Sequence, residues 1–218
     1  MKMFSTAFAL SATLFLAAQE PLPIQLPGPA SGGAALTDAL KGRRSLRTLA
    51  GPGLTLAEAG QLLWAAQGEN RPGKRTVPSA HARYPLELYL LTQGSDTLPA
   101  GVYHYEPKDN QITRTMDGGP AAVLGKLKGM QPWIAAAPAV FVLAGVPTRI
   151  DPAGTGTAQY FTYYEAGGAG QDLLLQAVAL GLEGGTAGGL DMAALGQALK
   201  LPAGTQAMMV LPVGREKR

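Results

Sequence analysis

The chain of 218 residues contains no cysteine and only two histidines, His81 and His104. Without cysteine, disulfides, thiolate nucleophiles and cysteine-ligated metal centres are excluded. A metal site or a Ser-His-Asp triad would have to use one of the two histidines, and we expect no metal site. The 15 acidic residues are scattered, and none of their spacings is typical of a catalytic carboxylate pair. If the chain is an enzyme, a bound organic cofactor should therefore carry its chemistry.

Charge is also scarce along this chain. Charged residues make up 15% of it against 46% hydrophobic residues, and the formal net charge is only +3 at pH 7. Basic residues do not gather into the stripe that nucleic-acid-binding proteins present, so we expect no nucleic-acid partner. Glycine-rich nucleotide loops and the HExxH and GxSxG motifs are absent from the sequence. The hydrophobic content of a chain this long predicts a substantial buried core.

Residues 1–18 have the pattern of a Sec-type signal peptide. Lys2 supplies the positive start, Phe8–Ala18 is apolar, and small residues precede Gln19. The apolar run is too short to cross a bilayer, so we expect no stable membrane span. We expect an exported protein, periplasmic or secreted; an N-terminal core helix is the alternative interpretation.

The remaining chain divides into a proline-rich, extended lead-in (19–33) and one domain (34–218). Within the domain, Thr55 and Glu58 have the spacing of a capping box, followed by apolar residues at helical spacing up to Gly68. Helices are also predicted over 34–41, 120–128, 158–182 and 191–200, strands over 86–91, 138–145 and 206–213, and a hairpin over 101–106 and 111–115. This irregular alternation predicts an α+β fold with a central mixed sheet flanked by helices.

Three short segments are candidate ligand contacts. Arg43, Arg44, Ser45 and Arg47 follow the first predicted helix, and their guanidinium and hydroxyl groups suit a phosphate; a solvated basic turn is the alternative. The second segment is a loop of small residues before a strand, which would let a flat ligand approach the main chain. The third is a glycine pair that could bring backbone N–H groups to a ring edge or merely form a turn. The loop consists of Pro78, Ser79 and Ala80, and the glycine pair is Gly184 and Gly185. His81 follows the loop directly and could contact a substrate or be an ordinary loop histidine.

The order of these pieces resembles the nitroreductase superfamily, and in particular its SagB-type dehydrogenase branch. The motifs run RRSLR, LLWAAQG, NRPGKRTVPSA, YPLELYLL and GVYHYEP, and continue with WIAAAPAVFVLAG, EAGGAGQDLLLQAVALGL and LPVG. The resemblance covers about residues 36–214. It departs from the branch's usual PSAGALYP, because this chain reads PSAHARYP with His81 in place of a glycine.

The resemblance implies a homodimer with FMN sites at the subunit interface. By resemblance, Arg43, Arg44, Ser45 and Arg47 would hold the phosphate and ribityl end of FMN, with Arg215 as a further phosphate contact. The loop from Pro78 to His81 would line one edge of the isoalloxazine ring, and Gly184 and Gly185 would meet the ring from the other side. The cofactor-binding set is therefore Arg43, Arg44, Ser45, Arg47, Pro78, Ser79, Ala80, His81, Gly184, Gly185 and Arg215.

The function that this resemblance implies is FMN-dependent oxidation and reduction. A small-molecule donor would reduce the flavin at N5 and an acceptor would then take the electrons, in a ping-pong cycle without a catalytic side chain. Two alternatives stay open: an azoline-type peptide dehydrogenase, and a non-catalytic flavin-binding protein in which His81 blocks the site. Export would separate the protein from cytoplasmic NAD(P)H, so the electron donor stays open too.

Overall fold

The computed structural model describes residues 20–217, and the predicted signal peptide lies outside the described residues. The strands are β1 (Ile24–Gln25), β2 (Leu49–Ala50), β3 (Glu69–Arg71), β4 (Lys74–Arg75), β5 (Leu86–Thr92), β6 (Gly101–Glu106), β7 (Gln111–Asp117), β8 (Ala139–Gly145), β9 (Glu183–Gly184) and β10 (Gln206–Glu216). The α-helices are α1 (Leu36–Gly42), α2 (Leu56–Gln67), α3 (Pro120–Leu124), α4 (Pro132–Ala135), α5 (Gly156–Ala179) and α6 (Met192–Ala198). Two 3₁₀ turns, η1 (Ala80–Ala82) and η2 (Pro147–Arg149), flank β5 and β8.

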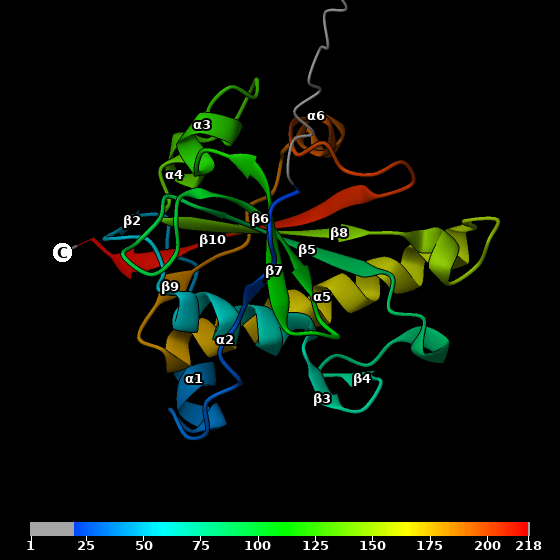
Figure 1. Cartoon of the computed structure of the whole chain (residues 1–218), viewed down its shortest axis with the longest axis horizontal. Coiled ribbons are helices and arrows are strands. Elements are labelled where there is room, and N and C mark those ends of the chain that lie inside the picture. The colour runs from blue at the N-terminus through cyan, green and yellow to red at the C-terminus, as the bar shows by residue number, and fades with distance from the viewer. Residues whose placement is uncertain (1–19, 218) are drawn as a thin grey trace, which may run out of the picture.

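One sheet forms the centre of the molecule, in the order β1-β7-β6-β5-β8-β10-β2, with β9 also paired to β10. Figure 1 shows α1, α2 and α5 on one side of this sheet and α3, α4 and α6 on the other. The α+β class is confirmed. The expectation of a mixed sheet needs correction, because the pairs between named strands are all antiparallel, and the parallel pairing between Ser45 and Gly184 is an isolated bridge.

Alternating side chains of the central strands build a separate core on each face of the sheet. Leu88 and Leu90 of β5 pack in the core under α2 and α5, whereas Tyr89 and Leu91 pack in the core under α3, α4 and α6. All seven residues of β8 are buried, because both of its faces are covered. The sheet therefore separates the molecule into two halves, each of which could hold its own site.

Local signals explain where the main helices begin. The Thr55 side chain accepts a hydrogen bond from the Glu58 N–H (3.2 Å), and the Glu58 carboxylate accepts one from the Thr55 N–H (2.8 Å), which completes the predicted capping box of α2. Asp191 caps α6 by accepting from the Ala194 N–H at 2.9 Å, as predicted. The long helix and the hairpin of β6 and β7 are confirmed as well.

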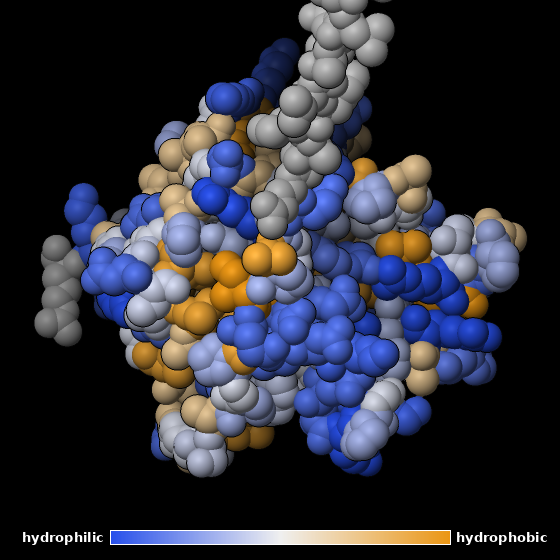
Figure 2. Space-filling model, viewed as in Figure 1, coloured by the Kyte–Doolittle hydropathy of each residue, from blue (hydrophilic) through white to orange (hydrophobic). Residues whose placement is uncertain are grey.

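Several observed elements were absent from the prediction. The segment before the small-residue loop forms a second hairpin, β3 and β4, which turns at Pro72 and Gly73. Figure 2 shows it as a hydrophilic projection at the lower right. The proline-rich lead-in is extended, but it also contributes β1 to the sheet edge and buries Leu26. Within residues 20–217, no helix combines the length and the apolar character needed to cross a membrane.

Candidate functional site

Three segments that are distant in sequence meet around β9. Ser45 forms the isolated bridge with Gly184, and the Leu46 N–H donates to the Gly184 carbonyl at 3.1 Å. Gly184 also pairs with Val213 of β10, and two residues further along the strand Arg215 pairs with Ala50 of β2. A Cβ on Gly184 would lie 2.8 Å from the Pro212 carbonyl oxygen, so only glycine fits there. The fold thus brings together the arginine segment, the glycine pair and the last strand.

Carboxylates already engage two of the predicted phosphate-binding arginines. Arg44 forms ion pairs with Glu183 (3.2 Å) and Glu216 (2.7 Å), and these interactions, led by the hydrogen bond to Glu183, raise its pKa. Arg215 donates from Nη2 to Glu58 at 2.6 Å. Its Nη1 is buried and has no hydrogen-bond partner among the described residues. Arg215 therefore retains an unused donor, whereas the Arg44 charge is balanced within the chain.

Arg43 and Arg47 lie beside this cluster without a salt bridge to any residue between 20 and 217. Arg43 is half-buried and Arg47 is exposed, with its guanidinium 5.9 Å from the centre of the Trp133 ring. An arginine stacked on an aromatic ring still presents its N–H groups to an anion. These two side chains and Arg215 Nη1 are the donors available to a phosphate.

The small-residue loop is attached to α5 through a buried carboxylate. Glu165 is only 3% exposed, and its Oε1 accepts from the Ser79 hydroxyl and from the Ala80 N–H, both at 2.9 Å. Ser79 Oγ in turn accepts from the Tyr84 N–H at 2.8 Å. Burial raises the pKa of Glu165, and the hydrogen bonds from Ala80 and Ser79 offset part of that rise. Glu165 therefore sets the position of the loop predicted to face a ring.

Three non-glycine residues in this loop have left-handed backbone conformations. His81, Ala82 and Tyr84 have φ angles of 53°, 53° and 46°. Side chains disfavour such angles, and clusters of them occur at functional sites more often than elsewhere. The angle at His81 gives a physical reason for the glycine that the SagB-type branch usually has there. The His81 side chain is exposed at the rim of a hollow of about 500 Å³, whose other walls include Arg71, Lys74 and Arg75.

Within one protomer the loop and the arginine cluster lie at different places along α5. Glu165 holds the loop, whereas Leu174, nine residues further on, lies against Gly184. At 1.5 Å per residue this is a separation of about 14 Å along the helix axis. The structure therefore does not bring every predicted cofactor residue into a single pocket of one chain.

An aromatic surface lies on the N-terminal half of α5. Tyr160, Tyr163 and Tyr164 are 63%, 53% and 67% exposed, and Phe161 is 37% exposed. The rings of Tyr160 and Tyr164 stack with their centroids 6.4 Å apart. Large aromatic side chains in such numbers on one helix mark an interaction surface rather than a solvated face.

Comparison with known proteins identifies the family. A model described as "Nitroreductase family" matches residues 40–215, which is most of the chain. The chain belongs to the nitroreductase family. It is 34% identical over 184 residues to a protein named "Putative nitroreductase" from Methanocaldococcus jannaschii, covering 83% of this chain and 91% of that protein. Membership in this family establishes the protein as an oxidoreductase.

Solved structures show the same fold. A nitroreductase-like protein of Ralstonia eutropha JMP134 superposes with a TM-score of 0.79 at 24% identity, covering 93% of this chain and 96% of that one. A structure of the Escherichia coli microcin synthetase McbBCD complex with truncated pro-MccB17 contains a chain that superposes with a TM-score of 0.66 at 18% identity. The match covers 97% of this chain and 85% of that one. At these identities the likeness is one of fold.

Sequence reasoning missed residues on which this nitroreductase-family site depends. Glu165 positions the loop, Glu58 holds Arg215, and Trp133 stacks against Arg47. One signal was available, because Glu165 is an acidic residue near the start of an apolar helical run. Among residues 20–217, no group of three or more histidine, aspartate or glutamate side chains could hold a metal ion.

Replacing Glu165 tests the attachment of the loop. Glu165→Ala leaves the Ser79 hydroxyl and the Ala80 N–H without an acceptor, so we expect the free energy of unfolding to fall by about 2–4 kcal/mol. Glu165→Gln retains an acceptor and should lose only about 1 kcal/mol. Urea denaturation measures both, with exposed Glu106→Ala as the control. A loss for Glu165→Ala no larger than the control's would contradict this role.

The Glu165→Gln comparison also has a definite pH dependence. The pKa of Glu165 is raised from 4.5 in the folded protein, so the folded state holds the proton more tightly than the unfolded chain. Its contribution to stability is thus full below pH 4.5 and is lost as the pH rises through the folded pKa. The free energy of unfolding of wild type should therefore exceed that of Glu165→Gln by less and less as the pH rises. A difference that grows with pH would contradict the upward shift of the Glu165 pKa.

Proposed function

We propose that this nitroreductase-family protein is an FMN-dependent oxidoreductase that works as a homodimer. The main support is the pairing of Ser45 with Gly184, which brings the segment that carries Arg43 and Arg47 to the end of β10, where Arg215 lies. The unpartnered Nη1 of Arg215 is a buried donor that a phosphate oxygen would satisfy. The residues present therefore fit the phosphate end of FMN.

Each segment has its own task in this proposal. Arg43, Arg47 and Arg215 bind the phosphate, and Arg44 holds Glu183 and Glu216 rather than the cofactor. Gly184 and Gly185 let the main chain approach the ligand closely, since no side chain projects from them. When bound, FMN supplies hydride and electron transfer at N5, which no side chain of this thiol-free chain provides.

The loop from Pro78 to His81 is proposed to line the ring edge. Glu165 fixes the backbone of Ser79 and Ala80, so that N–H groups of the loop are oriented before a ligand arrives. His81 stands at the exposed rim, where it would contact a substrate rather than take part in the chemistry. Because the loop and the arginine cluster are separated along α5, we propose that the loop of one protomer and the cluster of its partner complete each pocket.

We further propose that the chain belongs to the SagB-type branch and that residues 1–18 direct its export. The motif order around PSAHARYP supports the branch. Azoline-type peptide dehydrogenation, which the resemblance to that branch allows, is the second candidate function. Export favours a small-molecule donor and acceptor, because the partner proteins of peptide maturation would not meet an exported protein. Detection of the protein in the periplasmic or secreted fraction, cleaved near Gln19, supports export; retention of the full chain in the cytoplasm contradicts it.

The absorbance spectrum of the purified protein tests the proposal directly. We expect a yellow protein with an FMN spectrum and one FMN per chain. Loss of the colour with a reductant such as NADPH, and its return with a quinone or a nitroaromatic compound, supports small-molecule oxidoreduction. Return of the colour only with an azoline-containing peptide supports the second candidate. A colourless protein that takes up no added FMN contradicts both and leaves a non-catalytic role.

A further inference from the structure

A second cavity, with both polar and apolar walls, lies on the face of the sheet opposite the core under α5. It measures about 640 Å³, and side chains of β5, β6 and β7 form its floor. Its rim comes from the segment after α6 (Leu199–Thr205) and from the segment with Val146 and Arg149. None of the residues proposed for FMN lines it, and its floor lies on the face of the sheet opposite the core that contains Glu165's helix. Arg149 connects its rim to the small-residue loop, since Arg149 Nη1 donates to the Tyr84 carbonyl at 3.2 Å.

A tightly paired carboxylate stands in this cavity. Glu87 Oε2 lies 2.5 Å from His104 Nε2, and the other oxygen, Oε1, accepts from Arg149. Burial by itself would raise the pKa of Glu87, but the hydrogen bond from His104 and the charge of Arg149 outweigh it and hold the pKa below its ordinary value. Glu87 is thus ionised, with both oxygens occupied. It orients His104 and Arg149, and its charge is largely compensated.

The Tyr89 hydroxyl is an unused donor in the wall of this cavity. Tyr89 is 5% exposed and its ring lies against the His104 ring, with the centroids 5.0 Å apart. The other buried tyrosines of the sheet have acceptors: Tyr103 donates to the Pro99 carbonyl at 2.9 Å and Tyr105 to Asn110 Oδ1 at 3.0 Å. The Tyr89 hydroxyl has no such partner among residues 20–217, although it lines the cavity. Burial raises the pKa of Tyr89 to about 12, so the hydroxyl keeps its proton.

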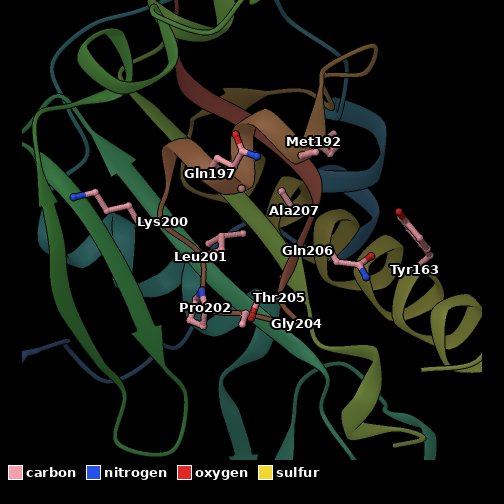
Figure 3. Close-up of a pocket in the computed structure, with 13 residues that line it drawn as sticks. Tyr163, Met192, Gln197, Lys200, Leu201, Pro202, Gly204, Thr205, Gln206 and Ala207 are labelled. Carbon is pink, nitrogen blue, oxygen red and sulfur yellow. The ribbon is translucent and has the colours of Figure 1, made fainter. Parts of the chain in front are cut away.

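The balance of charge in the cavity favours an anion. Lys200 and Arg149 are cationic and Glu87 is the one carboxylate among the lining residues, so lysine, arginine and glutamate together contribute a net charge of +1. Figure 3 shows the Lys200 side chain directed away from Tyr163 and Gln197, toward the green strands. Lys200 forms no salt bridge within the described part of the chain. Met116 and Leu199 add apolar surface.

We propose that this cavity binds a small organic carboxylate with an apolar body. The carboxylate accepts hydrogen bonds from the Tyr89 hydroxyl and from the Lys200 ammonium group, and the apolar body lies against Met116 and Leu199. The Tyr89 hydroxyl has no protein acceptor, and Lys200 has no salt bridge within the described residues. Because both line the cavity, they suit an anionic acceptor better than a neutral ligand. No bond is made or broken, so the site is one of binding only.

Histidine NMR tests this site with or without FMN. The chain has only His81 and His104, so ¹⁵N-histidine labelling gives ring signals from two imidazoles, and His81→Gln assigns them. We expect 3-phenylpropionate to shift the His104 signal and not that of His81, with a dissociation constant on the order of 1 mM, as a fragment of this size allows. 3-Phenylpropionamide and inorganic phosphate should bind at least about tenfold more weakly, because the amide lacks the carboxylate and phosphate lacks the apolar body.

Two variants locate the contacts. Tyr89→Phe removes the hydroxyl without breaking any described hydrogen bond, so it should fold normally and bind phenylpropionate about tenfold more weakly. Lys200→Asn suits the left-handed backbone at that position (φ 52°) and should weaken binding about three- to fivefold. Lys108→Asn, at an exposed turn, is the charge-matched control and should bind like wild type. An unmoved His104 signal, equal binding of the amide, or unchanged binding by Tyr89→Phe would each overturn the proposal.

Discussion

Arg47→Ala and Arg215→Ala are each expected to weaken FMN binding by about 10- to 100-fold. Charge-assisted hydrogen bonds to a phosphate contribute about 1.5–3 kcal/mol each, which corresponds to this range. Arg215 Nη1 is buried without a partner, and Arg47 forms no described salt bridge, so both guanidinium groups have donors for a phosphate. Arg43→Ala should act in the same direction. Fluorescence titration of the apoprotein with FMN gives the dissociation constant of each variant.

Two controls separate phosphate contact from a general loss of charge. Lys126→Ala removes an exposed cation and should leave FMN affinity unchanged. His81→Ala should weaken FMN binding far less than the arginine variants, because His81 stands at the rim of its loop. Arg215→Ala should still fold, since Glu58 Oε2 keeps its hydrogen bonds to Thr55. Equal FMN retention by Arg47→Ala, Arg215→Ala and His81→Ala would defeat the assignment.

The double variant Tyr160→Asp/Tyr164→Asp is expected to convert the dimer to a monomer. The two rings stack on α5 and are 63% and 67% exposed, so a partner helix is expected to cover them. Burying unpaired carboxylates costs several kcal/mol, and about 4 kcal/mol would raise the dimer dissociation constant about 1,000-fold. Light scattering measures the mass in solution. Because each pocket is proposed to use both protomers, the monomer should also lose FMN.

The matched control places two aspartates elsewhere on the surface. Ala121→Asp/Lys126→Asp lies at exposed positions in and just after α3, on the other side of the sheet, and should remain a dimer with FMN. Circular dichroism should show both double variants folded, since the substituted side chains are exposed. A Tyr160→Asp/Tyr164→Asp protein that stays dimeric would refute the interface, and a folded monomer that retains FMN would refute the shared pocket.

Several elements could be predicted because their signals are local. The α2 helix begins with reciprocal hydrogen bonds between residues three apart, and the apolar run of β8 reflects burial on both faces. The β3–β4 hairpin had a signal too, the Pro72-Gly73 turn, although the sequence predicted no strand on either side of it. The short strands β2 and β9 had no such signal, because each consists of two residues whose pairing partner in β10 is distant in the chain.

In the candidate site, too, local features could be predicted from the sequence and long-range contacts could not. Residue types alone indicated an anion-binding arginine segment, a loop of small residues and a cofactor in place of catalytic side chains. They could not show that Arg44 would meet Glu183 and Glu216, or that Arg215 would keep one donor free, because ion pairs depend on which strands lie side by side. His81 could be recognised as a departure from glycine, but its strained backbone became visible only with the φ angle.

Periodicity and capping, which depend on neighbours within a few residues, were sufficient to predict the α+β class of this protein. The order of its motifs gave the resemblance to the family that the comparisons then showed. The positions of Glu165, Glu87 and Tyr89 followed from long-range packing instead. A buried carboxylate is stable only with a partner, and the partners of Glu165 and Glu87 come from elements distant in the chain. The separation of the loop from the arginine cluster along α5, and the cavity on the opposite face, therefore required the folded molecule.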